Sequence, residues 1–127
     1  MFGALLISAC ASSNPPDALH QEVKTLISWI ETTRMVGQAW KAGWVPSTYA
    51  ARTIQTAQET LQKESETIQS FPIADKTRAD LRARIQQMQD SLGQAEMAVK
   101  NSDRTGVDTA MSQLTAAEQI LEAGVKQ

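Results

Sequence analysis

The side chains that could carry acid–base or metal chemistry are sparse in this sequence. His20 is the single histidine, and Glu22 and Lys24 follow it closely. A general base or a metal ligand needs a second convergent group, and the sequence supplies none beside His20. Haem ligation would pair His20 with a methionine such as Met88 or Met111, but there is no C-x-x-C-H attachment motif. We therefore expect no metal site and no cofactor.

The acidic residues form no recognisable catalytic pattern either. A di-metal site in a helix bundle needs inward-facing Glu-x-x-His pairs, and the sequence has none. It also has no glycine-rich phosphate loop and no G-x-S-x-G nucleophile motif. Carboxylates scattered over polar positions are expected to pair with Lys or Arg on solvated faces; they are Glu59, Glu64, Glu66, Asp80, Asp90, Glu96, Glu118 and Glu122. We expect no enzymatic activity.

Charge and cysteine content exclude further classes of protein. The chain has 12 Lys+Arg against 14 Asp+Glu, a formal net charge of −2, and Asp80 opposes the small cluster of Arg78, Arg82 and Arg84. Nucleic-acid binding needs a clustered positive excess, so we expect no nucleic-acid partner. A single cysteine excludes an intramolecular disulfide and a Cys-rich zinc or iron–sulfur site. With 127 residues, 42% of them hydrophobic, the chain can bury one domain core.

Aromatic residues are concentrated around one segment. Trp29, Trp40 and Trp44 lie within sixteen residues of one another, and Tyr49 follows shortly after. One interpretation is that these rings fill the core. The other is an exposed apolar patch that docks a partner, with six candidate partner-binding residues: Trp29, Val36, Trp40, Trp44, Val45 and Tyr49.

The beginning of the chain has the pattern of a targeting signal. Residues 1–9 read M-F-G-A-L-L-I-S-A and are uncharged, and Cys10 follows. This run is too short to span a bilayer, which takes ~20 apolar residues, but it suits the apolar part of a secretory signal. Ile7-Ser8-Ala9-Cys10 resembles the lipobox of bacterial lipoproteins, which is a branched aliphatic residue, two small residues and the cysteine that receives lipid.

The resemblance implies a membrane anchor. It implies diacylglycerol on Cys10, cleavage before that residue and a third acyl chain on the new amino terminus; more than one chain gives stable anchoring. Ala11 stands where Asp would be the usual inner-membrane retention signal in enteric bacteria, so the implied location is the periplasmic face of the outer membrane. Because the first cationic residue is Lys24, the expected signal peptide, residues 1–9, is N-terminally truncated.

Residues 10–16 would then be the lipidated cysteine and its tether, and 17–127 a helical domain. The alternative is a cytoplasmic protein with a buried N-terminal segment and an inert thiol.

The remainder of the chain has the 3-4 apolar spacing of amphipathic helices. The positions are Leu19, Val23, Leu26, Ile30, Thr33, Gly37, Trp40 and Trp44; Ala50, Ile54, Ala57, Leu61, Ser65, Ile68 and Phe71; Leu81, Ile85, Met88, Leu92, Ala95 and Val99; and Val107, Ala110, Leu114, Ala117, Leu121 and Gly124. Four such segments with short connections predict an all-α, up-down-up-down four-helix bundle. The alternative is a three-helix bundle with a partly detached first helix.

Capping chemistry falls where the periodicity pauses. Asn14 is expected to cap the first helix and Ser47 the second, after a break at Gly43 and Pro46. After the Phe71-Pro72 break, Asp75 is expected to open the third helix. Residues 101–103 end that helix, and Thr105 to Asp108 approximates a capping box for the fourth.

These observations predict a non-enzymatic protein-binding or adaptor module on the bacterial envelope. Its membrane contact would be the lipidated Cys10, and its partner another envelope protein. The alternative is a bundle that holds an apolar small molecule or inhibits an enzyme. Neither the oligomeric state nor the identity of the partner follows from the sequence.

Overall fold

Four helices make up the part of the chain that the structure describes. A computed structural model describes the backbone of residues 15–126 and the side chains of residues 18–123. The helices are α2 (Pro15–Lys41), α3 (Ser47–Gln69), α4 (Asp75–Lys100) and α5 (Arg104–Lys126), and no strand occurs among the described residues. The expected cap Asn14, the lipobox and Cys10 lie outside this range.

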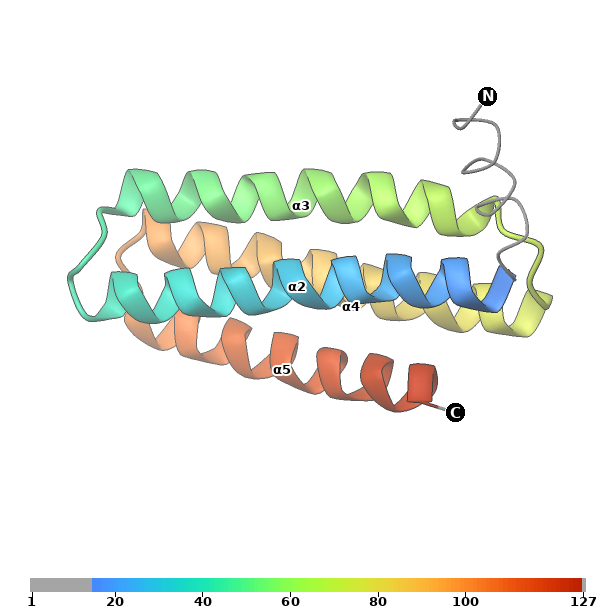
Figure 1. The fold of residues 1–127 in the computed structure, drawn as a ribbon. Coiled ribbons are helices and arrows are strands. Elements are labelled where there is room, and N and C mark those ends of the chain that lie inside the picture. The colour runs from blue at the N-terminus through green and yellow to red at the C-terminus, as the bar shows by residue number, and fades with distance from the viewer. Residues whose placement is uncertain (1–14, 127) are drawn as a thin grey trace, which may run out of the picture.

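The helices run alternately up and down and close into a ring (Figure 1). Helix α3 packs on α2, α4 on α3 and α5 on α4, and α5 returns to pack on α2. The predicted all-α four-helix bundle is therefore confirmed. The alternative with a partly detached first helix is wrong, because α2 packs on both α3 and α5.

The core follows the predicted apolar positions closely. Every predicted position from Val23 to Trp40 in the first helix is buried, and so are all those from Ile85 to Val99 in the third. Among the predicted positions whose side chains the structure describes, Trp44 is exposed, at 81%, and four are half-buried: Leu19, Ser65, Phe71 and Leu81. Gly124 lies outside those side chains. Four buried residues were not predicted, because each lies next to a predicted apolar position and not at one; they are Ala51, Ser91, Ala98 and Glu118.

The connections sit at opposite ends of the bundle. The α2–α3 loop, residues 42–46, and the α4–α5 turn, residues 101–103, lie at one end; the α3–α4 loop and the start of α2 lie at the other (Figure 1). We call the first end the Trp44 tip and define it as residues 42–49 and 101–103. Among the described residues, no helix is long and apolar enough to cross a bilayer.

The α4–α5 turn combines a helix stop with a helix start. Ser102 adopts φ +54°, its N–H donates to the Val99 carbonyl at 3.1 Å, and the Asp103 N–H donates to the Ala98 carbonyl at 2.7 Å. This pair of bonds is a Schellman motif, in which glycine usually holds the positive-φ position. The Asp103 carboxylate then accepts from the Gly106 N–H at 2.9 Å, so that Asp103 caps α5.

The predicted capping box at Thr105 is therefore wrong, since Thr105 already lies inside the helix that begins at Arg104. A capping box also needs a Glu or Gln at the third helical position. Here that residue is Gly106, and a Cβ added to it would lie 2.5 Å from the Asp103 Oδ2. The glycine leaves room for the cap that is actually used.

The prediction that Asp75 opens the third helix is confirmed. Helix α4 begins at Asp75 after Ala74, and no side chain caps it. Instead, Arg78 donates to the Asp75 carboxylate at 2.8 Å and to the Phe71 carbonyl at 2.8 Å, which ties the loop to the first turn of the helix. Asp80 pairs with Lys76 rather than with the arginine cluster.

Replacement of Ser102 by glycine should stabilise the protein. The left-handed conformation costs an L-residue about 1–2 kcal/mol, and glycine avoids this cost. Part of the gain is offset because glycine increases the conformational entropy of the unfolded chain. We expect Ser102→Gly to raise the free energy of unfolding by about 0.5–1 kcal/mol in urea titrations. Ser112→Gly, at an exposed position inside α5, is the control and should lower it. A loss of stability in both variants would contradict the strain at Ser102.

Candidate functional site

The Trp44 tip is built by a precise helix ending. Gly43 has φ +81°, its N–H donates to the Trp40 carbonyl at 3.0 Å, and the Trp44 N–H donates to the Ala39 carbonyl at 2.9 Å. This is a second Schellman motif, with the expected glycine in the left-handed position. The left-handed turn at Gly43 leads the chain away from the core, and the side chain that follows it, Trp44, is exposed to solvent as a result.

Trp40 belongs to the core and not to the surface. Its side chain is 9% exposed, and its indole N–H donates to the Ser47 hydroxyl at 2.9 Å across the loop. The expectation that Ser47 caps α3 is therefore wrong: Pro46 is the N-cap residue and no side chain caps the helix. The Ser47 hydroxyl satisfies a buried indole instead, which fixes the loop from the inside.

The six predicted partner-binding residues separate into two groups. Trp29, Val36 and Val45 are half-buried and pack against the core, and Trp40 is buried. Trp44 and Tyr49 are 81% and 54% exposed. They are five residues apart, on either side of the start of α3. A binding role stays a prediction, and the geometry leaves these two rings as the ones available to a partner.

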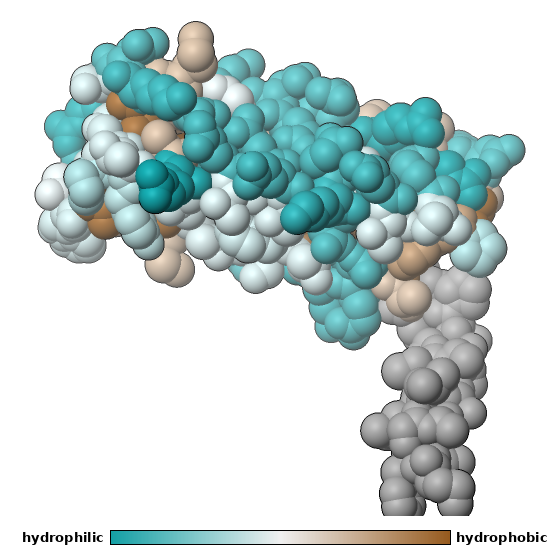
Figure 2. Space-filling view, turned by 90° about the horizontal axis from the view of Figure 1, so that it is seen from above, coloured by the Kyte–Doolittle hydropathy of each residue, from teal (hydrophilic) through white to brown (hydrophobic). Residues whose placement is uncertain are grey.

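The surface around the tip differs from the middle of the bundle. Seen from above, hydrophobic surface gathers at the two ends of the molecule, while the face along α3 is mostly hydrophilic (Figure 2). A shallow groove beside the tip runs between the start of α3 and the end of α4. Its lining consists of Ser47, Thr48, Ala51, Arg52, Gln55 and Lys100.

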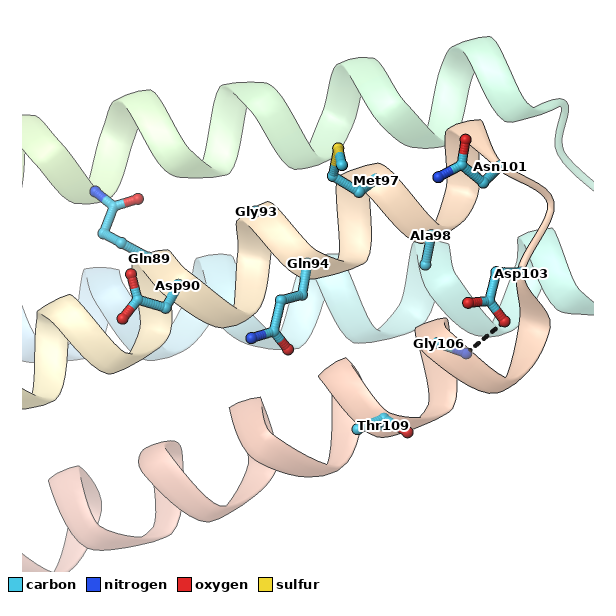
Figure 3. A pocket seen from close by; sticks show the side chains of 10 residues that line it. All are labelled: Gln89, Asp90, Gly93, Gln94, Met97, Ala98, Asn101, Asp103, Gly106 and Thr109. Atoms are coloured by element: carbon cyan, nitrogen blue, oxygen red, sulfur yellow. Dashed lines mark hydrogen bonds between the residues drawn. The ribbon is translucent and has the colours of Figure 1, made fainter.

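Another open groove lies between α4 and α5 and carries mainly amide and small side chains. In Figure 3, Met97 and Gln89 point toward α3, whereas Gln94 points toward α5. Asp90 and Asp103 supply its acidic groups, and Asp103 is already bonded to the Gly106 N–H. Two separate carboxylates without a convergent nucleophile or base do not make an acid–base site.

Sequence reasoning missed a buried ion pair that joins the first and last helices. Arg34 of α2 donates to the Glu118 carboxylate of α5 at 3.1 Å, and Glu118 is only 3% exposed. Burial raises the pKa of the Glu118 carboxyl above its usual 4.5; the Arg34 guanidinium opposes this effect, and the Glu31 and Glu122 carboxylates add to it. The sequence pattern predicted that Glu118 lies on a polar face, because it comes one residue after the predicted apolar position Ala117.

The described residues contain no group of three His, Cys, Asp or Glu side chains placed to hold a metal ion. Of the two methionines considered above for haem ligation, Met88 is buried in the core and Met111 lies against Gly37. Comparisons of the chain with protein-family models, with curated proteins and with solved structures find no match.

The different burial of the two tryptophans predicts different losses on truncation. Trp40→Ala should lower the free energy of unfolding by about 3–5 kcal/mol, because it removes a buried ring. Trp44→Ala should change it by less than about 0.5 kcal/mol, because the ring is exposed. Urea denaturation followed by circular dichroism measures both. A large loss in Trp44→Ala would show that this ring packs against the domain.

Glu118 should give the stability a distinctive pH dependence. Because the pKa of Glu118 is raised in the folded protein, the carboxyl stabilises the fold most below pH 4.5, and this contribution is lost as pH rises through the folded pKa. Glu118→Gln keeps the shape and an acceptor for Arg34 but does not ionise. We therefore expect this variant to have a higher Tm than the natural protein at pH 7 and an equal Tm near pH 4.

The control is Glu59→Gln, which removes an exposed carboxylate from α3. If Glu118→Gln lowers the Tm at pH 7 but not at pH 4, the attraction to Arg34 outweighs the cost of burial. The upward direction assigned to the pKa shift of Glu118 would then be wrong.

Proposed function

We propose that this protein is a lipid-anchored envelope protein whose helical domain binds another protein without catalysing a reaction. The observation that carries the proposal is the exposed Trp44 and Tyr49 pair at the tip of a well-packed bundle. Exposed Trp and Tyr side chains that contribute little to the packing of a domain often form the centre of a protein interface.

The lipobox-like pattern before the domain supports the anchor. With Cys10 lipidated, the residues between Cys10 and Pro15 would hold the start of α2 within about 18 Å of the lipid. Helix α2 has 27 residues, a length of about 40 Å at 1.5 Å per residue. The start of α2 lies at one end of the bundle and the Trp44 tip at the other (Figure 1), so an anchor at Cys10 would hold the end opposite the tip. In this arrangement the tip faces away from the outer membrane, toward partners in the periplasm.

The alternative of a bundle that holds an apolar small molecule has less support. That reading needs a cavity beside Trp29 and Trp40. Four grooves on the described residues lie outside the core: two between α4 and α5, one between α3 and α4, and one between α2 and α5. Trp29 and Trp40 line none of these grooves.

The anchor is tested in the host by the substitution Cys10→Ser. Intact-mass analysis of the natural protein from the membrane fraction should find a chain that begins at Cys10 and carries acyl groups. The variant should lose both the acyl groups and the membrane association. An unlipidated natural chain that begins near Met1 would refute the anchor and favour the cytoplasmic alternative.

The protein-binding role is tested in the same strains with a photo-crosslinking residue at position 44. A specific adduct to an envelope protein is expected there, and Tyr49→Ala should weaken it. The same residue placed at Gln62, an exposed position on α3 beyond the tip, is the control. Equal crosslinking from positions 44 and 62 would contradict a docking site at the tip.

A further inference from the structure

The hairpin formed by the end of α2 and the start of α3, which carries Trp44, is one-sided in charge. Residues 32–58, which include the tip hairpin, contain Arg34, Lys41 and Arg52 and no Asp or Glu. This segment has a net charge of +3 in a protein of net charge −2. The rest of the chain holds the other nine Lys+Arg and all fourteen Asp+Glu, a net charge of −5. The hairpin is thus positive, whereas the end of α4 and the start of α5, which lie at the same end of the bundle, carry Asp90, Glu96, Asp103 and Asp108 against Lys100 and Arg104.

Two of the three cations are already committed to carboxylates of α5. Arg34 pairs with Glu118, and Lys41 pairs with Asp108. Arg52 is exposed and takes part in no ion pair among the described residues. It lies one helical turn from Tyr49 and lines the groove at the start of α3. The positive charge that remains available at the tip is therefore next to the exposed aromatic rings.

The groove has no acidic side chain in its lining. Lys100 of α4 stands opposite Arg52, and Ser47, Thr48 and Gln55 add hydroxyl and amide groups. Lys100 pairs with Glu96 of its own helix at 2.8 Å, and Gln55 donates to the same carboxylate at 2.6 Å. Glu96 is thus held by two partners, which leaves Arg52 to attract an incoming carboxylate.

We propose that the partner docks at the Trp44 tip through an acidic segment, in which carboxylate side chains stand next to an apolar one. A carboxylate would meet Arg52, and the apolar side chain would pack on Trp44 and Tyr49. Arg, Trp and Tyr are the side chains that most often dominate binding energy at protein interfaces.

The occupant is a protein segment rather than an anionic lipid surface. Both would suit cations beside aromatic rings. However, the tip lies about 40 Å along α2 from the end at which the anchor would enter, so the tip would face away from the membrane that holds the protein. This choice rests on the proposed function.

The experiment uses the full chain, labelled with nitrogen-15, and three probes. Two peptides are identical except that one alternates Glu with Leu and the other alternates Gln with Leu; the third probe is vesicles of phosphatidylglycerol and phosphatidylcholine. We expect the acidic peptide to shift the indole signal of Trp44 and the Nε signal of Arg52, and to bind less tightly as salt rises. The Gln peptide should bind more weakly.

Arg52→Gln should weaken binding of the acidic peptide about two- to fivefold, the range for one exposed charge pair. Arg84→Gln, which removes an equal charge from the first half of α4, is the matched control and should leave the binding unchanged. Equal weakening in both variants would overturn the inference, because it would reflect net charge alone.

Other outcomes separate this inference from the proposed function. If both peptides bind equally at Trp44, the acidic segment is wrong while docking at the tip stands. If vesicles but not peptides perturb Trp44, the occupant is a lipid surface and the inference fails. If no probe perturbs the tip, the inference also fails, and crosslinking from position 44 still decides whether the tip binds a protein.

Discussion

The return of α5 onto α2 is the contact on which the whole bundle depends. Each helix has an apolar stripe too wide to be covered by one neighbour, so the four helices bury their stripes only when the ring closes. The other three helix pairs are neighbours in the chain and need only a short turn to meet. The closing pair joins residues as distant in sequence as Arg34 and Glu118, which are 84 positions apart. Its polar bonds specify how the two helices align, whereas its apolar contacts supply most of the stability.

The apolar spacing was sufficient to predict the architecture, because a 3-4 pattern records directly which face of a helix is buried. Its failures have local physical causes. The pattern continued to Trp44, but Gly43 had already reversed the chain in a left-handed turn, so the next side chain left the core. Ser47 looked like a cap by residue type, yet a buried indole claimed its hydroxyl. Glu118 looked like a surface carboxylate, because only the position of α2 in space shows that an arginine lies beside it.

The candidate site was predicted only in part, because the sequence pattern does not show where a turn leads the chain away from the core. Composition indicated a cluster of aromatic residues but could not separate the rings of the core from those of the surface. The separation comes from the turn at Gly43: Trp40 precedes it and is buried, whereas Trp44 follows it and is exposed. A helix ending therefore produces the surface proposed for binding, and the indole bond from Trp40 to Ser47 holds that ending in place.

The turn between α4 and α5 limits how the protein can change in length. Asp103 gives its N–H to the end of one helix and its carboxylate to the start of the next. Because the same residue completes both helix ends, an insertion in this turn would break one of these bonds and rotate one helix against the other. The loop at residues 70–74 is bonded to both of its helices as well, because the Phe71 N–H donates to the Ile68 carbonyl of α3 and the Phe71 carbonyl accepts from Arg78 of α4. Both connections of α4 therefore constrain how many residues can lie between the helices that they join.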